Sequence, residues 1–437
     1  RYYFFSDPSI PREYERTVPQ VFPTTAPGNF TWLEDCQHFV MTTFYPYQWD
    51  LNYHNSRVFN EMIYNYLFLA NKGVDMLRLD AVPYIWKELG TDCRNRPQVH
   101  TIVRMMRMIG EIVCPSVILL GEVVMEPVKV TPYFGTPEKP ECHLLYNVTT
   151  MCTTWHTAAT KDTRLLRRQL DMINSLPKEC VFFNYLRCHD DIGWGLDYTW
   201  LRQNFGIDET AHKKFLNDWF QGHWEGSVSR GELYNDDFAS RDARLCGTTA
   251  SLCGIEKAGF ESDSAAMERA IRFDLMLHAT MFMQTGIPLL YSGDELAQVN
   301  DYSYKDDPNK ADDSRYLHRG RLRWELAERA DDPSTPEGRI FCGLKALGDL
   351  RRSNSAFSAS ADVWTLDTGD DGVLAIGRYF DGYKVIGVFN FTEWEKRITL
   401  PHDPGEFIDM LAGTPHVLQD LAVPPCGFYY LEQVQMP

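Results

Sequence analysis

Apolar and polar residues follow two patterns along this chain, and the pattern changes near residue 355. Before that point, stretches with apolar residues at helical spacing are each followed by a short, continuously apolar run. In 56–72 the apolar residues recur three and four positions apart, which predicts a helix with Ser56 as its N-cap and Gly73 as its stop. The apolar run 74–79 follows at once and predicts a strand.

The same order then repeats. Helices are predicted around 97–113, 162–175 and 265–283, and strands at 116–122, 142–147, 180–191 and 287–295. Strands that are apolar throughout are buried on both faces, which is typical of parallel sheets that alternate with helices. Several of these strands end in charged residues, and a (β/α)8 TIM barrel places its site at the carboxyl ends of its strands. An α/β fold of the barrel type is therefore favoured over a doubly wound sheet.

Three segments lack this order. Residues 1–54 are rich in proline and predict a loop-rich subdomain, and 193–262 form a long aromatic and charged insertion of the kind that is usually functional. After residue 355, alternating strand-like runs, the first of them at 373–380, are separated by Gly, Asp and Pro and predict a C-terminal antiparallel β-sandwich. We therefore expect subdomains at 1–54 and 193–262, barrel segments at 55–192 and 263–354, and the sandwich at 355–437.

Charge and cysteine content narrow the class of partner. Lys and Arg number 43 against 60 Asp and Glu, a formal net charge of −17. Such a surface repels phosphate backbones and anionic lipid, so we expect no nucleic acid and no membrane partner. The 11 cysteines form no C-x-x-C pair and no apolar run is long enough to cross a bilayer, which indicates reduced thiols in a cytoplasmic protein. A secreted protein whose leader has been removed is the alternative.

The stretch "GVDMLRLDAVPYIWK" places a charged pair inside an apolar run. On a strand, Arg78 and Asp80 point to the same side. A carboxylate beside a guanidinium stays ionised, as a nucleophile must, although a buried ion pair that only fixes packing is the alternative. Glu122 ends the next strand after Gly121. Desolvation there would favour its protonated form, as an acid/base requires; a loop carboxylate or helix N-cap is the alternative.

A third strand ends in "RCHDD", which contains His189, Asp190 and Asp191. The spacing does not match a metal site, whereas carboxylate and imidazole groups can bind sugar hydroxyls. For His189 alone, a buried core histidine is the ordinary alternative. Taken together, the strand ends carry what a retaining glycosidase needs: an ionised nucleophile and a separate acid/base about 5–5.5 Å apart.

At this point a resemblance can be stated. "GVDMLRLDAV", "LLGEVV" and "RCHDDIGW" resemble three of the four signature regions of the alpha-amylase superfamily. "FYPYQWDLNYHN", "NYLRCHDDIGWG" and "NKADDSRYLHR" are similar to the amylosucrase branch and its sucrose-hydrolysing relatives. The resemblance implies that 1–54 follows barrel strand 3, that 55–192 supplies strands 4–7, and that 263–354 supplies strand 8. The first signature, the first strands and a helical N-terminal domain are then expected from residues outside this sequence or from a second fragment.

The resemblance also implies roles for single residues. Asp80 would attack the anomeric carbon of the glucosyl unit of sucrose, and Glu122 would protonate the departing fructosyl oxygen and later deprotonate the acceptor. Asp190 would grip the glucose hydroxyls and stabilise the oxocarbenium-like transition state. The remaining implied substrate-binding residues are Arg78 and His189 beside Asp190, Phe44 and Gln48 in the glucosyl pocket, Asp191 on the acceptor side, and Arg315, which would pair with an aspartate from outside this sequence to close the pocket floor.

The function that this resemblance implies is a retaining glucosyltransferase that builds α-1,4-glucan from sucrose and releases fructose. A sucrose hydrolase and a non-catalytic amylase-like binding subunit are the alternatives. We expect no cofactor and no metal, because the acidic run 301–313 lacks the ligand spacing of a calcium loop. The expected partners are sucrose and glucan or oligosaccharide acceptors, with a homodimer, or a second fragment that supplies the N-terminal part, as the protein partner.

Overall fold

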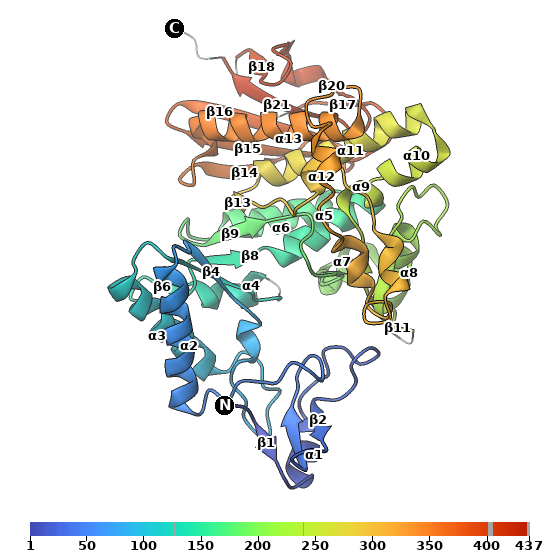
Figure 1. Ribbon diagram of the computed structural model, residues 1–437. Helices are drawn as coiled ribbons and strands as arrows, with labels where there is room; N and C mark the ends of the chain where they lie inside the picture. Colours follow the sequence, from blue (N-terminus) through green and yellow to red (C-terminus); the bar gives the residue numbers. More distant parts are fainter. Residues whose placement is uncertain (126, 239, 401–404, 435–437) are drawn as a thin grey trace. The chain divides into compact units, whose positions relative to one another are not determined.

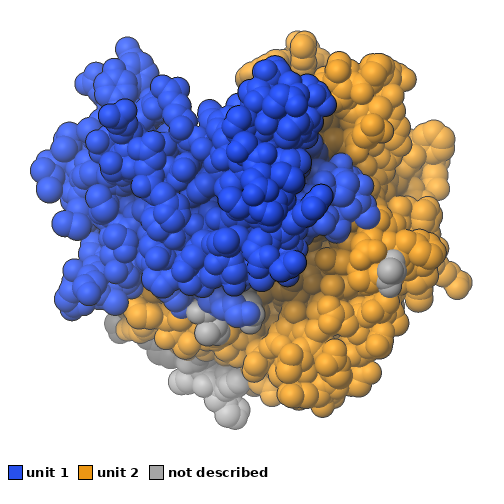
Figure 2. All heavy atoms as spheres, turned by 90° about the horizontal axis from the view of Figure 1, so that it is seen from below, with its two compact units in different colours: residues 1–146 blue, residues 147–437 orange. Residues whose placement is uncertain are grey.

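The computed structural model describes residues 1–125, 127–238, 240–400 and 405–434 (Figure 1). The chain separates into two compact units, residues 1–146 and 147–437, which Figure 2 shows in different colours. Among the described residues, no helix combines the length and the apolar character that crossing a bilayer requires.

The first unit begins with a small antiparallel sheet where the sequence predicts loops. β1 (Phe4–Phe5), β3 (His38–Met41) and β2 (Phe30–Leu33) pair in that order, and α1 (Ser9–Glu15) lies between β1 and β2 in the chain. Strands this short leave no alternation that a sequence pattern could reveal. The segment is ordered by a buried cluster that includes Tyr3, Tyr14 and Met41.

The rest of the first unit follows the predicted order of helices and strands. It contains α2 (Ser56–Asn71), β4 (Met76–Leu79), α3 (Pro97–Val113), β5 (Ile118–Gly121) and β8 (Leu144–Tyr146), and β4, β5 and β8 pair in parallel. The N-cap of α2 is Asn55, whose side chain accepts from the Arg57 amide, and not Ser56 as predicted. Shorter elements fill the connections: η1 (Val82–Tyr84), α4 (Pro127–Val130), η2 (Thr131–Phe134), β6 (Gly135–Thr136) and β7 (Lys139–Pro140).

The second unit opens with a helix that periodicity does not predict, α5 (Val148–Thr160). Nearly all of it is buried, so it has no polar stripe to detect. Threonine hydroxyl groups in this helix donate hydrogen bonds to backbone carbonyl oxygens one turn earlier. Thr153, for example, donates to the Thr149 carbonyl at 2.7 Å. The predicted helices are present as α6 (Arg164–Asn174) and α11 (Ser264–Met283), and β9 (Val181–Asn184) pairs in parallel with β13 (Ile287–Pro288).

Both of these strands are shorter than predicted. β9 ends at Asn184, so residues 187–191 form a loop beyond the strand instead of its last residues. The insertion forms α7 (Tyr198–Phe205), α8 (Glu209–Phe220), α9 (Thr249–Leu252), α10 (Ile255–Glu261) and an antiparallel sheet of β10 (Ile192–Gly193), β12 (Asp242–Cys246) and β11 (Glu232–Asp237). After β13 come η3 (Asp294–Leu296), η4 (Tyr302–Asp306), η5 (Ser314–His318), α12 (Trp324–Ala327) and α13 (Pro336–Ser353).

An antiparallel sheet forms the C-terminal part, as the alternating pattern predicts. Its strands are β14 (Asp362–Leu366), β15 (Val373–Phe380), β16 (Tyr383–Asn390), β21 (Phe428–Gln433), β18 (Phe407–Asp409) and β19 (Pro415–His416), in that spatial order, and β17 (Lys396–Ile398) pairs separately with β20 (Leu421–Val423). The buried Arg378 of β15 donates to four carbonyl oxygens, those of Ala356, Met283, Gln284 and Ser358. It thereby ties the sheet to the end of α11.

The described part of the first unit contains three parallel strands, and the described part of the second unit contains two. These five do not make an eight-stranded closed barrel among the described residues. The strand pairing of the described residues therefore does not by itself confirm the predicted barrel.

Candidate active site

In the first unit, two acidic side chains leave neighbouring strand ends. Leu79 at the end of β4 pairs with Gly121 at the end of β5, so Asp80 and Glu122 follow adjacent positions. Arg78 donates through Nη1 to Oδ1 of Asp80 at 2.6 Å and through Nη2 to Oε1 of Glu122 at 2.7 Å. Because both nitrogens belong to one guanidinium, the two carboxylates are close neighbours.

The three side chains differ in exposure. Asp80 is 71% exposed, whereas Glu122 is 18% exposed and Arg78 lies between them at 28%. Burial alone would lower the pKa of Arg78, but the charges of Glu122 and Asp80 outweigh it and raise that pKa above its usual value. The guanidinium also lies 5.8 Å from the ring centroid of Tyr146 at the end of β8. Asp80 is thus open to a ligand and is held by a permanent positive charge.

The turn after Asp80 is folded back onto Glu122. Ala81 has the left-handed φ of 45°, which costs a non-glycine residue about 1–2 kcal/mol. Its amide donates to Oε2 of Glu122 at 3.0 Å, and the Val82 amide donates to the Glu122 carbonyl at 3.3 Å. Both carboxylate oxygens of Glu122 therefore accept hydrogen bonds. Sequence reasoning missed this role of Ala81, because backbone strain leaves no pattern in composition or spacing.

Gly121 sets how closely β5 approaches β8. A Cβ at this position would lie 2.6 Å from Sγ of Cys142 and 2.8 Å from Cδ2 of Leu145. Real side chains essentially never make such contacts, so a Cβ here would force the side chains of Cys142 and Leu145 to move. The glycine therefore fixes the strand end from which Glu122 projects.

Phe44 and Gln48 lie in the loop 43–50 of the same unit. The ring of Phe44 makes an edge contact with Tyr84 at 5.3 Å between centroids, and Tyr84 ends the short helix η1 that follows Asp80. Phe44 is thus brought to the segment beyond the proposed nucleophile. Gln48 is exposed, and its backbone amide donates a hydrogen bond to the Tyr45 carbonyl.

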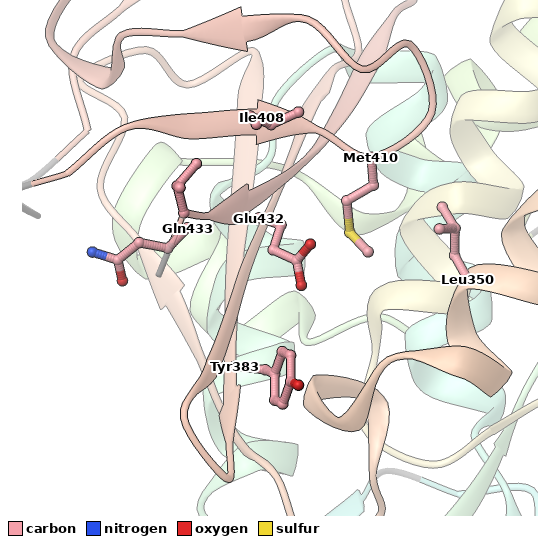
Figure 3. Close-up of a pocket in the computed structure, with 7 residues that line it drawn as sticks. Leu350, Tyr383, Ile408, Met410, Glu432 and Gln433 are labelled. Atoms are coloured by element: carbon pink, nitrogen blue, oxygen red, sulfur yellow. The ribbon is translucent and has the colours of Figure 1, made fainter. Parts of the chain in front are cut away.

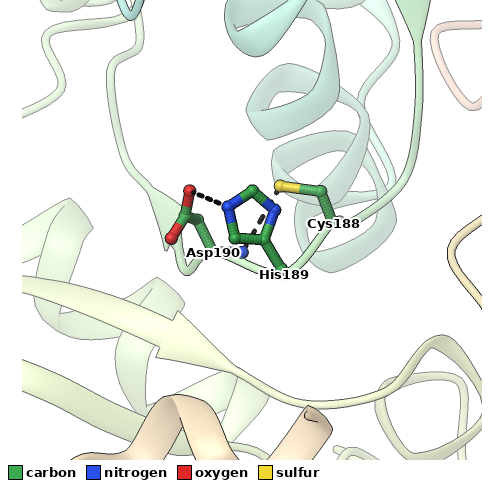
Figure 4. Close-up of side chains that lie close together, drawn as sticks. All are labelled: Cys188, His189 and Asp190. Atoms are coloured by element: carbon green, nitrogen blue, oxygen red, sulfur yellow. Dashed lines mark hydrogen bonds and ion pairs between the residues drawn. The ribbon is translucent and has the colours of Figure 1, made fainter. Parts of the chain in front are cut away.

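In the second unit, the loop beyond β9 carries the third predicted acid. Oδ2 of Asp190 lies 3.0 Å from Nε2 of His189, an interaction drawn in Figure 4. The other oxygen, Oδ1, accepts a hydrogen bond from Nη2 of Arg319 at 3.1 Å. Arg315 Nη1 is 3.9 Å from the same Oδ1. Burial would raise the pKa of Asp190, but His189, Arg319 and Arg315 together lower it to about 2. Asp190 is therefore ionised throughout the neutral range.

The backbone of this loop is fixed by the segment around η5. The Gly247 amide donates to Nδ1 of His318 at 3.2 Å, so the His318 Nε2 carries the proton and faces the His189 carbonyl at 3.4 Å. Burial, followed by the charges of Arg187 and Arg319, lowers the pKa of His318 to about 3, which keeps this ring neutral. Arg319 donates through Nε to the same carbonyl. Sequence reasoning missed His318 and Arg319, although both stand in the quoted string "DDSRYLHR".

Arg187 anchors the start of the loop. It is 2% exposed and pairs with the equally buried Asp294 at 2.8 Å. Its guanidinium also lies 4.6 Å from the ring centroid of Tyr291. Asp294 and Tyr291 follow β13, so the end of this strand fixes the loop that follows its parallel neighbour β9.

Arg315 and Asp191 find partners that the sequence did not indicate. Arg315 forms a bidentate pair with Asp313, with distances of 2.8 and 2.7 Å, where we expected an aspartate from outside this sequence. Asp191 accepts from Nη1 of Arg244 on β12 at 3.2 Å. The inserted segment therefore reaches the predicted site loop through Asp191.

The ligand set for a metal ion is weak. Cys188, His189 and Asp190 place one donor atom each within 4.8 Å of one another, as Figure 4 shows. However, Asp190 is already paired with His189 and faces the guanidinium groups of Arg315 and Arg319, which would repel a cation. Carboxylates of the acidic run 301–313 are engaged by the protein as well: Asp301 accepts from the Ser303 amide, Asp307 pairs with Lys310, and Asp313 with Arg315.

A hollow of about 400 Å³ lies elsewhere in the second unit, between the C-terminal sheet and α13. Figure 3 shows Tyr383, Glu432 and Met410 around it, and Leu350 of α13 closes one side. None of the predicted site residues lines it, so it is separate from the groups described above.

Comparison with known proteins shows what the chain is similar to. Residues 1–192 match the model described as the alpha-amylase catalytic domain. The glucosylglycerate phosphorylase of Spirochaeta thermophila is 30% identical over 366 residues, 83% of this chain and 58% of that protein. The glucosylglycerate phosphorylase of Escherichia coli (strain K12) is 26% identical over 386 residues, 86% of this chain and 64% of that protein. The chain thus spans less than two thirds of the length of these relatives.

Solved structures agree on the fold. Sucrose 6F-phosphate phosphorylase from Thermoanaerobacter thermosaccharolyticum aligns with a TM-score of 0.64 at 19% identity, over 94% of this chain and 73% of that chain. Trehalose-6-phosphate hydrolase from Bacillus licheniformis aligns with a TM-score of 0.62 at 17% identity, over 96% of this chain and 75% of that chain. Together with the matched catalytic domain, these neighbours imply a (β/α)8 barrel with a C-terminal β-sheet domain.

Proposed function

Because the chain is related to the glycoside hydrolases and phosphorylases of the alpha-amylase superfamily, we propose that it transfers an α-glucosyl unit with retention of configuration. The observation that carries this proposal is the pair of carboxylates on Arg78. Asp80 is exposed and ion-paired, as a nucleophile requires, and Glu122 lies beside it with less exposure, as an acid/base requires.

The first step breaks the glycosidic bond. An oxygen of Asp80 attacks the anomeric carbon while Glu122 gives a proton to the departing oxygen, which leaves a covalent glucosyl ester on Asp80. In the described structure each oxygen of Glu122 accepts a hydrogen bond, one from Arg78 and one from the Ala81 amide, and each keeps a second lone pair that can carry the proton. Asp190 belongs to the second unit and stays ionised; stabilisation of the oxocarbenium-like transition state is the role that the resemblance implies for it.

In the second step an acceptor attacks the same carbon from the opposite face and the ester to Asp80 breaks. Two inversions restore the α configuration. Inorganic phosphate is the acceptor we favour, because two relatives that align over more than four fifths of this chain are phosphorylases. A phosphate oxygen that is already deprotonated needs no base, and the product is then α-glucose 1-phosphate.

A second candidate keeps sucrose as donor and a growing glucan as acceptor. It is favoured by the strings "FYPYQWDLNYHN" and "NKADDSRYLHR", which resemble the amylosucrase branch. In this candidate Glu122 removes a proton from the acceptor hydroxyl, and water in place of the glucan makes the protein a sucrose hydrolase.

One assay separates these candidates. The purified protein is incubated with glucosylglycerate or with sucrose, each with and without inorganic phosphate, and glucose 1-phosphate, fructose, glucose and insoluble glucan are quantified. Phosphate-dependent glucose 1-phosphate supports phosphorolysis. Insoluble glucan from sucrose alone supports the amylosucrase candidate, and free glucose supports the hydrolase. If no substrate is turned over and a fluorinated glucosyl fluoride does not label Asp80, the result would support the non-catalytic binding subunit.

A further inference from the structure

A buried lysine lies just beyond the segment that carries the proposed nucleophile. The side chain of Lys87 is 1% exposed, and its ammonium contacts two groups from another part of the chain. It lies 2.8 Å from Oδ1 of Asp50 and donates to Oγ1 of Thr43 at 2.7 Å. A lysine is rarely so buried unless its charge is paired, so the site that receives it is a specific one.

Asp50 and Thr43 are the two ends of loop 43–50, and the same carboxylate closes that loop. Oδ2 of Asp50 accepts from the Thr43 amide at 2.7 Å, and the Asp50 amide donates to the Met41 carbonyl at 3.0 Å. Both oxygens of Asp50 are therefore used, one to join the loop ends and one to bind Lys87. We call Lys87, Asp50 and Thr43 the loop clamp.

Lys87 is itself fixed on its backbone side. Nε2 of His54 lies 2.7 Å from the Lys87 carbonyl, and the His54 ring stacks on Trp86 at 3.8 Å between centroids. The ammonium and the carbonyl of one residue thus connect loop 43–50 and the start of α2 to the segment that follows Asp80. Such a connection transmits the position of that segment to the loop.

Loop 43–50 is partly exposed and partly packed by ring contacts: Phe44 and Tyr45 lie 6.3 and 5.5 Å from Phe22 between centroids, and Trp49 lies 5.3 Å from Tyr2. Tyr47 is 75% exposed and Trp49 is 37% exposed, whereas Phe44 packs its edge against Tyr84 at 5.3 Å. Because exposed loop residues open at low free-energy cost, the contacts at the loop ends add to these ring contacts in holding Phe44.

We propose that Lys87 is a positioning residue, which acts through Asp50 and Thr43 to hold loop 43–50, and with it Phe44, beside the proposed nucleophile. The predicted effect on catalysis depends on the proposed function. The loop clamp itself is a property of the fold and does not depend on it. An apolar residue of similar bulk would fill the space of Lys87 but could not bind a carboxylate and a hydroxyl at the same time. The charged pair therefore determines the conformation of the loop rather than adding stability alone.

The test removes both charges together, because a lone buried Asp50 would destabilise the fold. In the double variant Lys87→Met/Asp50→Asn we expect KM for the glucosyl donor to rise roughly tenfold, with kcat changed by less than about threefold. Phe44→Ala should raise KM as well. Combined with Phe44→Ala, the clamp variant should add less than about twofold, because both changes remove the same contact. Independent, multiplied effects would overturn the proposal.

A matched control and a readout without activity complete the design. Lys178→Met/Asp362→Asn removes an exposed lysine–aspartate pair from the second unit and should leave KM and kcat unchanged. Hydrogen exchange of the amides in 43–50 should speed up at least tenfold in the clamp variant, while the amides of β5 keep their protection. Unchanged exchange in the loop would overturn the clamp even if the protein transfers no glucosyl unit. If the double variant does not fold, Thr43→Val can be used, because it removes only one hydrogen-bond acceptor of Lys87. It should raise KM and speed up hydrogen exchange in 43–50 by smaller factors.

Discussion

Arg319 donates through Nη2 to Oδ1 of Asp190 at 3.1 Å and through Nε to the carbonyl of His189. One guanidinium thus fixes both the charge of the proposed third acid and the backbone that carries it. Arg319 is 22% exposed, so its charge is only partly screened by water.

Replacing Arg319 by Gln tests this arrangement. Loss of a hydrogen bond to a charged group is worth about 1.5–3 kcal/mol, so kcat/KM should fall roughly ten- to hundredfold. The pKa of Asp190, about 2 in the protein, should rise because a positive neighbour is removed. The acidic limb of the pH–rate profile should therefore move to higher pH. Arg352→Gln, at an 81% exposed arginine, is the matched control; a uniform loss of rate with no displaced limb would argue for a structural role.

Glu122→Gln should remove proton donation and keep the shape of the site. We expect the rate with the natural glucoside to fall by about 10²–10⁴. α-Glucosyl fluoride should recover the first step, because fluoride leaves without a proton, whereas Asp80→Asn should abolish turnover of both donors. Glu111→Gln, at an exposed ion pair on α3, should behave like the parent protein. Equal losses on both donors in Glu122→Gln would contradict the acid role.

Gly121→Ala should disturb the strand end that carries Glu122. The new methyl would overlap Sγ of Cys142 and Cδ2 of Leu145, and overpacking of this kind costs about 1–3 kcal/mol. We expect a lower midpoint of urea unfolding together with a lower kcat. Adding Cys142→Ala should recover part of both, because it removes the nearer of the two atoms. No change in either quantity would show that the side chains of Cys142 and Leu145 can move aside without disturbing the strand end.

The buried histidines of the second unit predict a loss of stability in acid. The His156 and His212 rings lie 5.1 Å apart, and neither ring nitrogen of His156 has a hydrogen-bond partner among the described residues. Burial, then His212, lowers the pKa of His156 to about 3, and burial lowers that of His212 to about 4. Asp162, the acidic neighbour, acts in the opposite direction but does not reverse the shift in His156.

The unfolded chain binds a proton at an ordinary histidine near pH 6.5, and the folded protein does not until about pH 3–4. Stability should therefore fall as pH drops from about 6.5 toward 4, and each such histidine contributes about 2 kcal/mol between pH 7 and 5. In His156→Leu that decrease should shrink by this amount, as measured by urea unfolding at the two pH values. His223→Gln, at an exposed histidine, should leave the decrease unchanged. An equal decrease in His156→Leu and the parent would mean that His156 is already hydrated or charged.

Much of the framework follows from local pattern. The predicted helix 97–113 is α3 (Pro97–Val113), because its apolar residues recur at helical spacing, and the predicted strand 373–380 is β15 (Val373–Phe380), because it is a short apolar run bounded by Asp and Gly. Asp80 and Glu122 were selected as strand-end acids for the same reason. Their catalytic roles, like those of Asp190, His189 and Arg315, remain predictions that the variants above would test.

Other features required the folded chain. Periodicity missed α5, because a helix buried all round has no polar face, and it extended β9 into the loop at 187–191, because apolar residues continue past the last strand pairing. The contact of Arg78 with Glu122 depends on the register of β4 and β5. The contact of Lys87 with Asp50 depends on the position of loop 43–50, which is distant in the sequence. Sequence alone therefore determined which residues are charged, apolar or able to end a strand. Only the tertiary structure decided which charges share a partner, since an ion pair is set by distances in space that spacing along the chain does not contain.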